Sequence, residues 1–106
     1  MKLLNKPEYD FVEDFLKSYK LDFPTSQKYY FAMNEIIKFF NVPIYKEFLE
    51  LFYFERYQYK NRYPDNRSMF TYLSNKLFVR EPTLYVIRKE IVYKSAMILY
   101  KYDILE

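Results

Sequence analysis

Near its C-terminus the chain contains the stretch SMFTYLSNKLFVREPTLYVIRKEIVYK (residues 68–94), which decides the expected fold. It is typical of two helices that meet at a tight corner near Phe78. Pro82 suits the first turn of the second helix, because that turn leaves the backbone N–H groups unpaired in any case. The pattern predicts one helix over residues 67–77 and another from Pro82 to about Tyr102. The apolar residues spaced to close on one small core across the corner are Leu73, Leu77, Val79, Leu84 and Ile87.

The arrangement resembles a helix-turn-helix, in which the second helix is held at a steep angle to the first and can enter the major groove of DNA. At about 100° per residue, one face of the second helix carries Leu84, Ile87, Ile91, Ser95 and Ile98, and we expect it to pack on the preceding helix. A second apolar stripe on the opposite side contains Val86, Tyr93, Met97 and Tyr100. We expect the N-terminal helices to bury it, with a homodimer as the alternative.

Three more helices are predicted in residues 1–60. The first starts near Pro7 and buries apolar residues between Phe11 and Tyr19. Thr25 or Ser26 is the expected cap of the second, which runs through Phe40. The third starts at Pro43, continues to Lys60 and is apolar over most of its circumference. A loop follows, in which Asp65 or Asn66 can cap the fourth helix.

These elements predict an all-α fold, with five helices in a single domain of 106 residues. Residues 1–60 form an N-terminal helical layer, and residues 66–102 form the helix-turn-helix unit. Phe and Tyr make up a quarter of the chain, so we expect an aromatic core.

Composition argues against an enzyme. The chain has no His, Cys or Gly. The commonest zinc ligands, the commonest general base at neutral pH and the glycine loops that cradle phosphates are therefore missing. The first helix carries four acidic residues: Glu8, Asp10, Glu13 and Asp14. We expect these on a solvated face rather than around a cation. No catalytic residue, cofactor, metal or small-molecule substrate is expected.

No apolar run approaches the roughly 20 residues that cross a bilayer. Acidic residues follow soon after Met1, which is unlike a signal peptide. We therefore expect a cytoplasmic protein with no membrane partner.

Charge differs between the two halves of the chain. Residues 1–55 contain seven Lys and nine acidic residues, whereas residues 56–106 contain ten Lys or Arg and five acidic residues. The halves therefore carry −2 and +5. A basic half favours double-stranded DNA as partner, because neutralised phosphates release counterions. Stacking of the tyrosines on single-stranded bases is the weaker interpretation, because the rings fall at helical core spacing.

Residues 51–99 resemble the C-terminal helix-turn-helix of sigma factors, region 4, and more closely the sigma-like late transcription regulators of Gram-positive phages, of the ArpU and RinA type. The resemblance rests on Tyr53-Phe54-Glu55 before the loop, on Thr83-Leu84-Tyr85 at the start of the last helix, and on Arg88 and Lys89. Two positions depart from the family pattern. Phe78 replaces the usual glycine at the corner and needs either helical or strained backbone there. Ser74 replaces the favoured alanine.

The resemblance implies a sequence-specific DNA-binding transcription regulator, encoded by a phage or mobile element, with RNA polymerase as a candidate second partner. The residues expected to touch DNA are Arg80, Thr83, Tyr85 and Lys89, with Arg88 as a phosphate clamp and with Lys76 and Arg67 flanking the DNA backbone. The alternative is a small helical module that binds and modulates a host protein. Its support is the excess of aromatic residues on the third and fifth helices.

Overall fold

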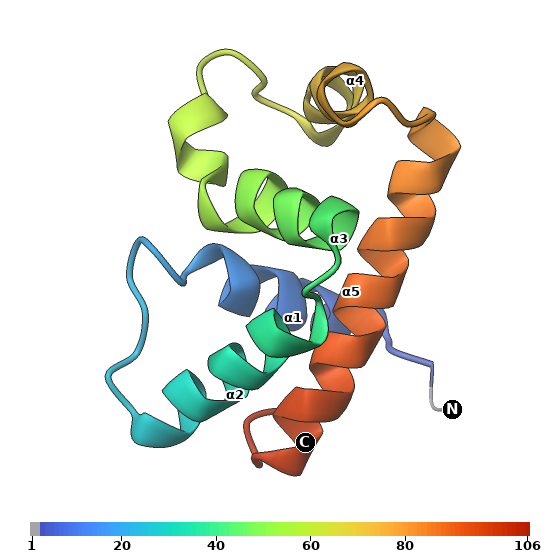
Figure 1. Ribbon diagram of the computed structural model, residues 1–106. Coiled ribbons are helices and arrows are strands. Elements are labelled where there is room, and N and C mark those ends of the chain that lie inside the picture. The colour runs from blue at the N-terminus through green and yellow to red at the C-terminus, as the bar shows by residue number, and fades with distance from the viewer. Residues whose placement is uncertain (1–2) are drawn as a thin grey trace.

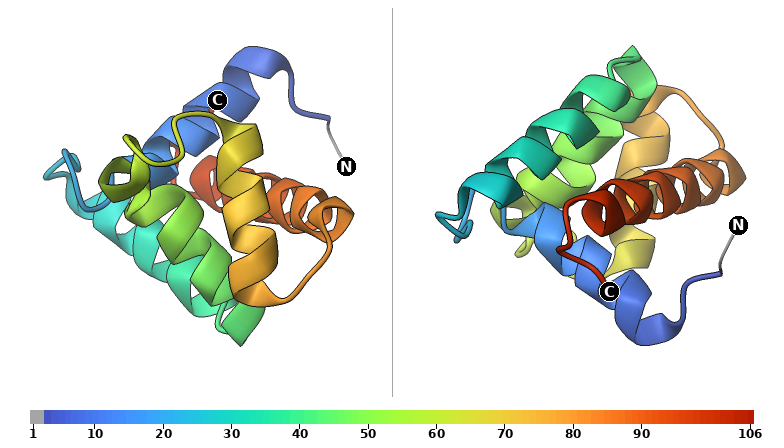
Figure 2. Two further views of the ribbon diagram at one scale, coloured as in Figure 1. Left: turned by 90° about the horizontal axis from the view of Figure 1, so that it is seen from above. Right: turned by 90° about the horizontal axis from the view of Figure 1, so that it is seen from below.

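The longest helix, α5 (Glu81–Lys101), is the element on which the other helices pack. The computed structural model describes residues 3–106, and these fold as an all-α protein without strands. In chain order the elements before α5 are α1 (Lys6–Lys17), α2 (Gln27–Phe39), α3 (Pro43–Phe48), η1 (Leu49–Phe54), η2 (Arg56–Tyr59) and α4 (Asn66–Leu77). Helices α1 and α2 lie on opposite sides of α5, and α4 crosses near its start (Figures 1 and 2).

Local signals fix the ends of several helices. Asn5 and Glu8 form a reciprocal capping box at α1: the Glu8 N–H donates to Asn5 Oδ1 at 2.9 Å, and the Asn5 N–H donates to Glu8 Oε1 at 3.0 Å. Asp65 caps α4 as predicted, since its Oδ1 accepts from the Ser68 N–H at 2.7 Å. Ser26 precedes α2, but its side chain makes no capping bond.

The predicted third helix is not one continuous α-helix. After α3 the chain widens into the π-helical η1, in which each N–H reaches back five residues instead of four. The Glu55 N–H continues this pattern, donating to the carbonyl of Glu50 at 2.7 Å. A 3₁₀ turn, η2, follows. Residues 51–54 are all buried, so the wide turn coincides with four consecutive large side chains that pack into the core.

The core is aromatic, as predicted. Four of its largest fully buried side chains are Tyr53, Phe48, Phe52 and Phe70. The ring of Phe52 lies 4.9 Å from those of Phe48 and Tyr53 and 5.3 Å from that of Phe70, measured between centroids. These rings join α3, η1 and α4 into one packed unit.

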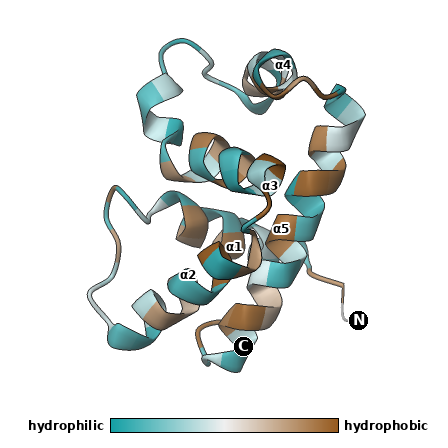
Figure 3. Cartoon of the chain, viewed as in Figure 1, coloured by the Kyte–Doolittle hydropathy of each residue, from teal (hydrophilic) through white to brown (hydrophobic). Residues whose placement is uncertain are grey.

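The corner between α4 and α5 closes as the apolar spacing predicted. Leu73, Leu84 and Ile87 are buried, and Leu77 and Val79 pack partly against them. Residues 78–80 form the connection, which is largely hydrophobic in Figure 3. Ser74 clamps it: the Ser74 hydroxyl donates to the carbonyl of Val79 at 2.6 Å, and the Val79 N–H donates to the carbonyl of Ser74 at 3.2 Å. The two helices meet at a steep angle, with α4 seen end-on in Figure 1.

Phe78 occupies the position at which the resemblance expects glycine. Its backbone is left-handed, with φ 57° and ψ 44°, and its side chain is 92% exposed. An L-residue with a Cβ pays a steric penalty in this conformation. Because its ring is exposed, Phe78 gains little hydrophobic stabilisation to offset this steric penalty.

Three predictions about burial are wrong. Two residues of the second stripe of α5, Val86 and Met97, remain exposed, whereas the other two, Tyr93 and Tyr100, are half-buried and contact Tyr9 and Glu8 of α1. In α1 the expected core position Phe11 is exposed, and so is Tyr30, which lies on the apolar stripe that helical spacing predicts for the second helix. Glu13, expected on the solvated face, is buried. The apolar residues of α5, seen as brown bands along it in Figure 3, therefore include both buried and exposed positions.

Candidate nucleic-acid interface

The first turns of α5 present polar and basic side chains to solvent. Thr83, Tyr85 and Lys89 are all exposed, as the sequence-based assignment of a DNA-contacting face requires. Tyr85 is 57% exposed, and the edge-to-face contact of its ring with Phe70, at 4.6 Å between centroids, fixes its direction. Arg80 stands at the N-cap and is also exposed.

The N-terminus of α5 carries no side-chain cap among the described residues. Its acidic first-turn residue, Glu81, accepts a hydrogen bond from the hydroxyl of Thr71 on α4, at 3.3 Å. Helix N-termini concentrate partial positive charge on their free N–H groups, which favours anions. Arg80 adds a full positive charge next to that end.

Arg67 and Lys76 are both exposed on α4 but are not brought together. They lie in the first and last turns of α4, about 14 Å apart along its axis and half a turn apart around it. Only Lys76 lies at the end of α4 beside the corner. One DNA backbone segment following the start of α5 can therefore meet Lys76 more readily than Arg67.

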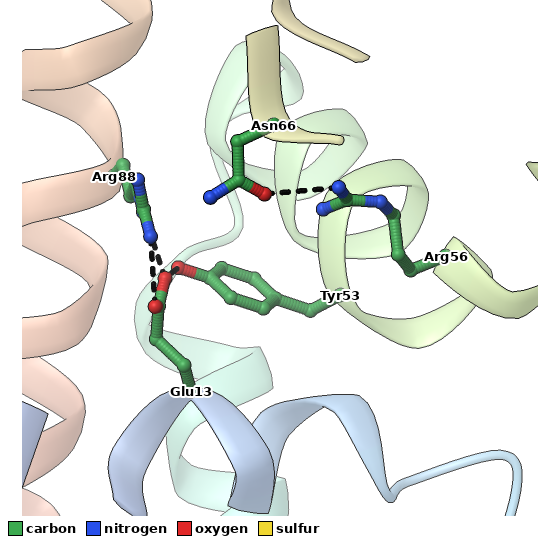
Figure 4. Close-up of polar contacts among 5 residues, drawn as sticks. All are labelled: Glu13, Tyr53, Arg56, Asn66 and Arg88. Carbon is green, nitrogen blue, oxygen red and sulfur yellow. Dashed lines mark hydrogen bonds and ion pairs between the residues drawn. The ribbon is translucent and has the colours of Figure 1, made fainter. Parts of the chain in front are cut away.

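Arg88 does not occupy the position expected of a phosphate clamp. Its Nε and one terminal nitrogen each donate to the carboxylate of Glu13 at 2.8 Å, a bidentate ion pair. The side chains of Arg88 and Glu13 are only 19% and 7% exposed. The Tyr53 hydroxyl donates to the same carboxylate at 2.7 Å (Figure 4). Because its guanidinium is bound to Glu13 within the protein, Arg88 is not free to contact a DNA phosphate.

The electrostatics of this buried cluster keep its members in their usual ionisation states. Burial alone would raise the pKa of Glu13, but the hydrogen bonds from Arg88 and Tyr53 outweigh it and hold that pKa below its ordinary value. The hydrogen bond to Glu13 raises the pKa of Arg88, and burial is the main reason that the pKa of Tyr53 is raised well above 10.0. A fixed ion pair thus ties α1 to α5, and Tyr53 joins η1 to it.

A second arginine anchors the loop before α4. The Arg56 guanidinium lies 4.6 Å from the ring centroid of Phe52 and donates to Oδ1 of Asn66 at 2.9 Å (Figure 4). Burial lowers its pKa. Sequence reasoning missed both arginine contacts. The one available signal for the Glu13–Arg88 pair was that each residue borders an apolar stripe of its own helix.

Within residues 3–106, no group of three or more acidic side chains is arranged to hold a metal ion. The same part of the chain contains no helix whose length and hydrophobicity would let it traverse a bilayer. Searches of protein-family models, curated proteins and solved structures yield no match to this chain. The resemblance to sigma-like regulators therefore remains a prediction.

Proposed function

We propose that this chain is a sequence-specific DNA-binding transcription regulator in which α4 and α5 act as a helix-turn-helix. The observation that carries the proposal is the exposure of Thr83, Tyr85 and Lys89 on the first turns of α5. Helices α1, α2 and α3 pack on α5, yet these three side chains, which lie on different sides of its first turns, remain accessible to a partner.

The geometry of the corner supports the same proposal. Three residues separate α4 from α5, the helices cross steeply, and Leu73, Leu84 and Ile87 form their shared core (Figure 1). Such turns often contain glycine. The left-handed backbone at Phe78 meets the same conformational demand with a different residue.

In this proposal α5 enters the major groove by its first turns. Thr83 and Tyr85 reach base edges, while Arg80, Lys89 and Lys76 pair with phosphates around the start of the helix. Arg88 serves the interface indirectly, because its ion pair with Glu13 holds α5 in a fixed orientation on α1. The N-terminal layer remains available for contact with RNA polymerase, and a phage or mobile element is the proposed source.

Selection from a pool of duplex DNA with a randomised core tests the proposal. We expect one sequence to be enriched, and binding to it to weaken steeply as salt rises, with a log–log slope of about −0.9 per phosphate contacted. Thr83→Ala and Tyr85→Ala should relax the selected sequence. Failure to retain any duplex in dilute buffer would contradict the proposal.

A second candidate function, a protein-binding module, is favoured by a separate observation. Val86 and Met97 form exposed apolar surface on α5, on a side that the DNA-contacting residues only partly share. The two functions are compatible in one chain.

A further inference from the structure

An open apolar groove runs along the outer side of α5. Its volume is about 600 Å³, within the range typical of ligand-binding clefts. Three elements supply its apolar lining: Val86, Tyr93 and Met97 from α5, Phe39 and Phe40 from the end of α2, and Leu3 from the N-terminal segment. Phe40 also belongs to the buried core, so the floor of the groove is continuous with that core.

The apolar side chains of the lining are exposed next to one another, unlike the isolated exposed apolar residues that are common on protein surfaces. Val86, Phe39 and Met97 are 55%, 54% and 49% exposed and gather around this one groove. Contiguous apolar surface of this kind marks interaction sites. Residues 86, 93 and 97 also share one side of α5 and extend about 16 Å along its axis, the length of about three helical turns. The shape therefore suits a helix lying alongside α5.

Two lysines give the groove an unbalanced positive charge. The Lys94 ammonium lies 4.3 Å from the ring centroid of Phe39, and that of Lys89 lies 5.8 Å from the ring centroid of Tyr93. Neither lysine forms an ion pair within residues 3–106. Glu90, the acidic residue of the lining, already accepts a hydrogen bond from the hydroxyl of Tyr45. The donor is a neutral hydroxyl, so the Glu90 carboxylate stays charged, and the two lysines with Glu90 give the lining of the groove a net charge of +1.

A second copy of the chain is a poor occupant of the groove. An antiparallel pairing of two α5 helices that sets Val86 against Met97 also sets Lys89 against Lys94. Such a pairing brings together two surfaces that each carry a net charge of +1, which costs free energy. Two-fold symmetry would in addition place one hollow against the same hollow, because each copy contributes the same patch.

We propose that this groove binds an acidic amphipathic helix of another protein. Apolar side chains of that helix, at positions i, i+3 or i+4, and i+7, would fill the groove over Val86 and Met97. Asp or Glu residues beside them would pair with Lys89 and Lys94. This inference does not depend on DNA binding, although Lys89 belongs to both surfaces, and a bound helix would therefore compete with DNA for it.

The test uses the full chain and three labelled peptides of about 16 residues, long enough to span the groove. One peptide is an amphipathic helix with a leucine face flanked by Glu, the second has Lys in place of Glu, and the third is a scrambled version of the first. We expect fluorescence anisotropy to show binding of the acidic peptide, at least tenfold weaker binding of the basic one, and none of the scrambled one.

Variants of the chain assign the binding to this groove. Met97→Glu and Lys94→Glu should each weaken binding of the acidic peptide at least tenfold. Their matched controls, Phe31→Glu on exposed α2 surface and Lys60→Glu, lie outside the groove and should bind like the parent chain. Methyl-labelled methionine should give a shifted NMR signal for exposed Met97 but unchanged signals for buried Met33 and Met69.

Three results would overturn the inference. Equal affinity for the acidic and basic peptides would remove the charge argument. Unchanged binding by Met97→Glu would place the peptide elsewhere. Sedimentation that shows a dimer of the parent chain and a monomer of Met97→Glu would assign the groove to a second copy.

Discussion

Glu13 and Arg88, 75 positions apart in the chain, share a bidentate ion pair that fastens the first helix to the last. The Tyr53 hydroxyl donates to the same carboxylate, so three elements converge on one charged side chain. Burying such a pair is expensive, but leaving one of its members unpaired is more expensive still. The cluster therefore constrains how α5 is oriented, beyond any net contribution it makes to stability.

The first prediction concerns the difference between the cost of burying the Glu13–Arg88 pair and the cost of burying one of its members alone. Glu13→Ala should lower the free energy of unfolding by about 3–5 kcal/mol, because it leaves the Arg88 guanidinium buried without its anion. The double variant Glu13→Leu with Arg88→Met should recover the part of the loss that comes from the unpaired guanidinium, but not the part that comes from the buried Tyr53 hydroxyl, which loses its acceptor in both variants. Urea unfolding measures both. The exposed ion pair of Lys101 with Glu35 is the control, and Lys101→Met should change stability little. A double variant no more stable than Glu13→Ala would show that the cost does not come from the unpaired charge.

The second prediction concerns pH. Because the folded-state pKa of Glu13 lies below its unfolded value, near 4.3, its contribution is fully present above that pH and is lost as pH falls through the folded pKa. The lowered pKa values of Glu35 and Asp65 act in the same direction. Unfolding free energy should therefore fall as pH is lowered from about 5 to 3. Glu13→Gln should flatten this fall, and an unchanged slope would contradict the assignment.

The third prediction concerns the left-handed residue at the corner. Phe78→Gly should raise the free energy of unfolding by up to about 1 kcal/mol. Glycine removes the steric penalty of the left-handed conformation, about 1–2 kcal/mol, but loses more backbone entropy on folding, which cancels part of that gain. The thermal midpoint should rise by a few degrees. Phe31→Gly is the matched control, since Phe31 is an exposed phenylalanine within α2, and it should lose about 1 kcal/mol. A loss of stability in Phe78→Gly would mean that its ring makes a stabilising contact.

The fourth prediction compares two serines. The Ser95 hydroxyl is fully buried and has no hydrogen-bond partner among the described residues, whereas that of Ser74 donates to the Val79 carbonyl. Ser95→Ala should therefore raise the free energy of unfolding by about 1 kcal/mol, and Ser74→Ala should lower it by about the same amount. Thermal and urea unfolding give both values. Similar losses in both variants would show that the Ser95 hydroxyl is satisfied in solution.

The fifth prediction rests on the proposed function. Arg80→Ala and Lys89→Ala should each weaken DNA binding for all sequences and reduce the salt slope by about one unit. Lys28→Ala is the control, because Lys28 lies near Asp103, beyond the far end of α5. Titrations at several salt concentrations measure the slopes. Equal slopes for the parent chain and the Lys89 variant would remove Lys89 from the interface.

Elements governed by neighbouring residues were predictable from the sequence. The Asp65 cap, the proline at the start of α5 and the apolar spacing across the corner all act within a few positions, and the structure confirms them. The exposure of Thr83, Tyr85 and Lys89 also agrees with the assigned helix faces. Whether that surface binds DNA remains a prediction.

Features that depend on distant contacts were not predictable. Glu13 appeared to be one of several solvated acids, because nothing near it in sequence identifies Arg88 as its partner. Periodicity correctly placed Val86 and Met97 on one stripe but could not tell what covers it. The change from α3 to η1 depends on packing around Phe52 and Tyr53, which helix propensity does not describe.

The wide turn of η1 has a consequence for insertions and deletions. A π-helical turn is equivalent to one extra residue accommodated within an α-helix. Deleting a single residue there would restore ordinary helical spacing and leave the chain on either side close to its present orientation, because the wide turn already absorbs the extra residue. A deletion in α3 would find no such turn to absorb it and would rotate the positions beyond it by about 100°. Tyr53 would then turn away from Glu13, so this stretch of the chain tolerates a change of length best at its wide turn.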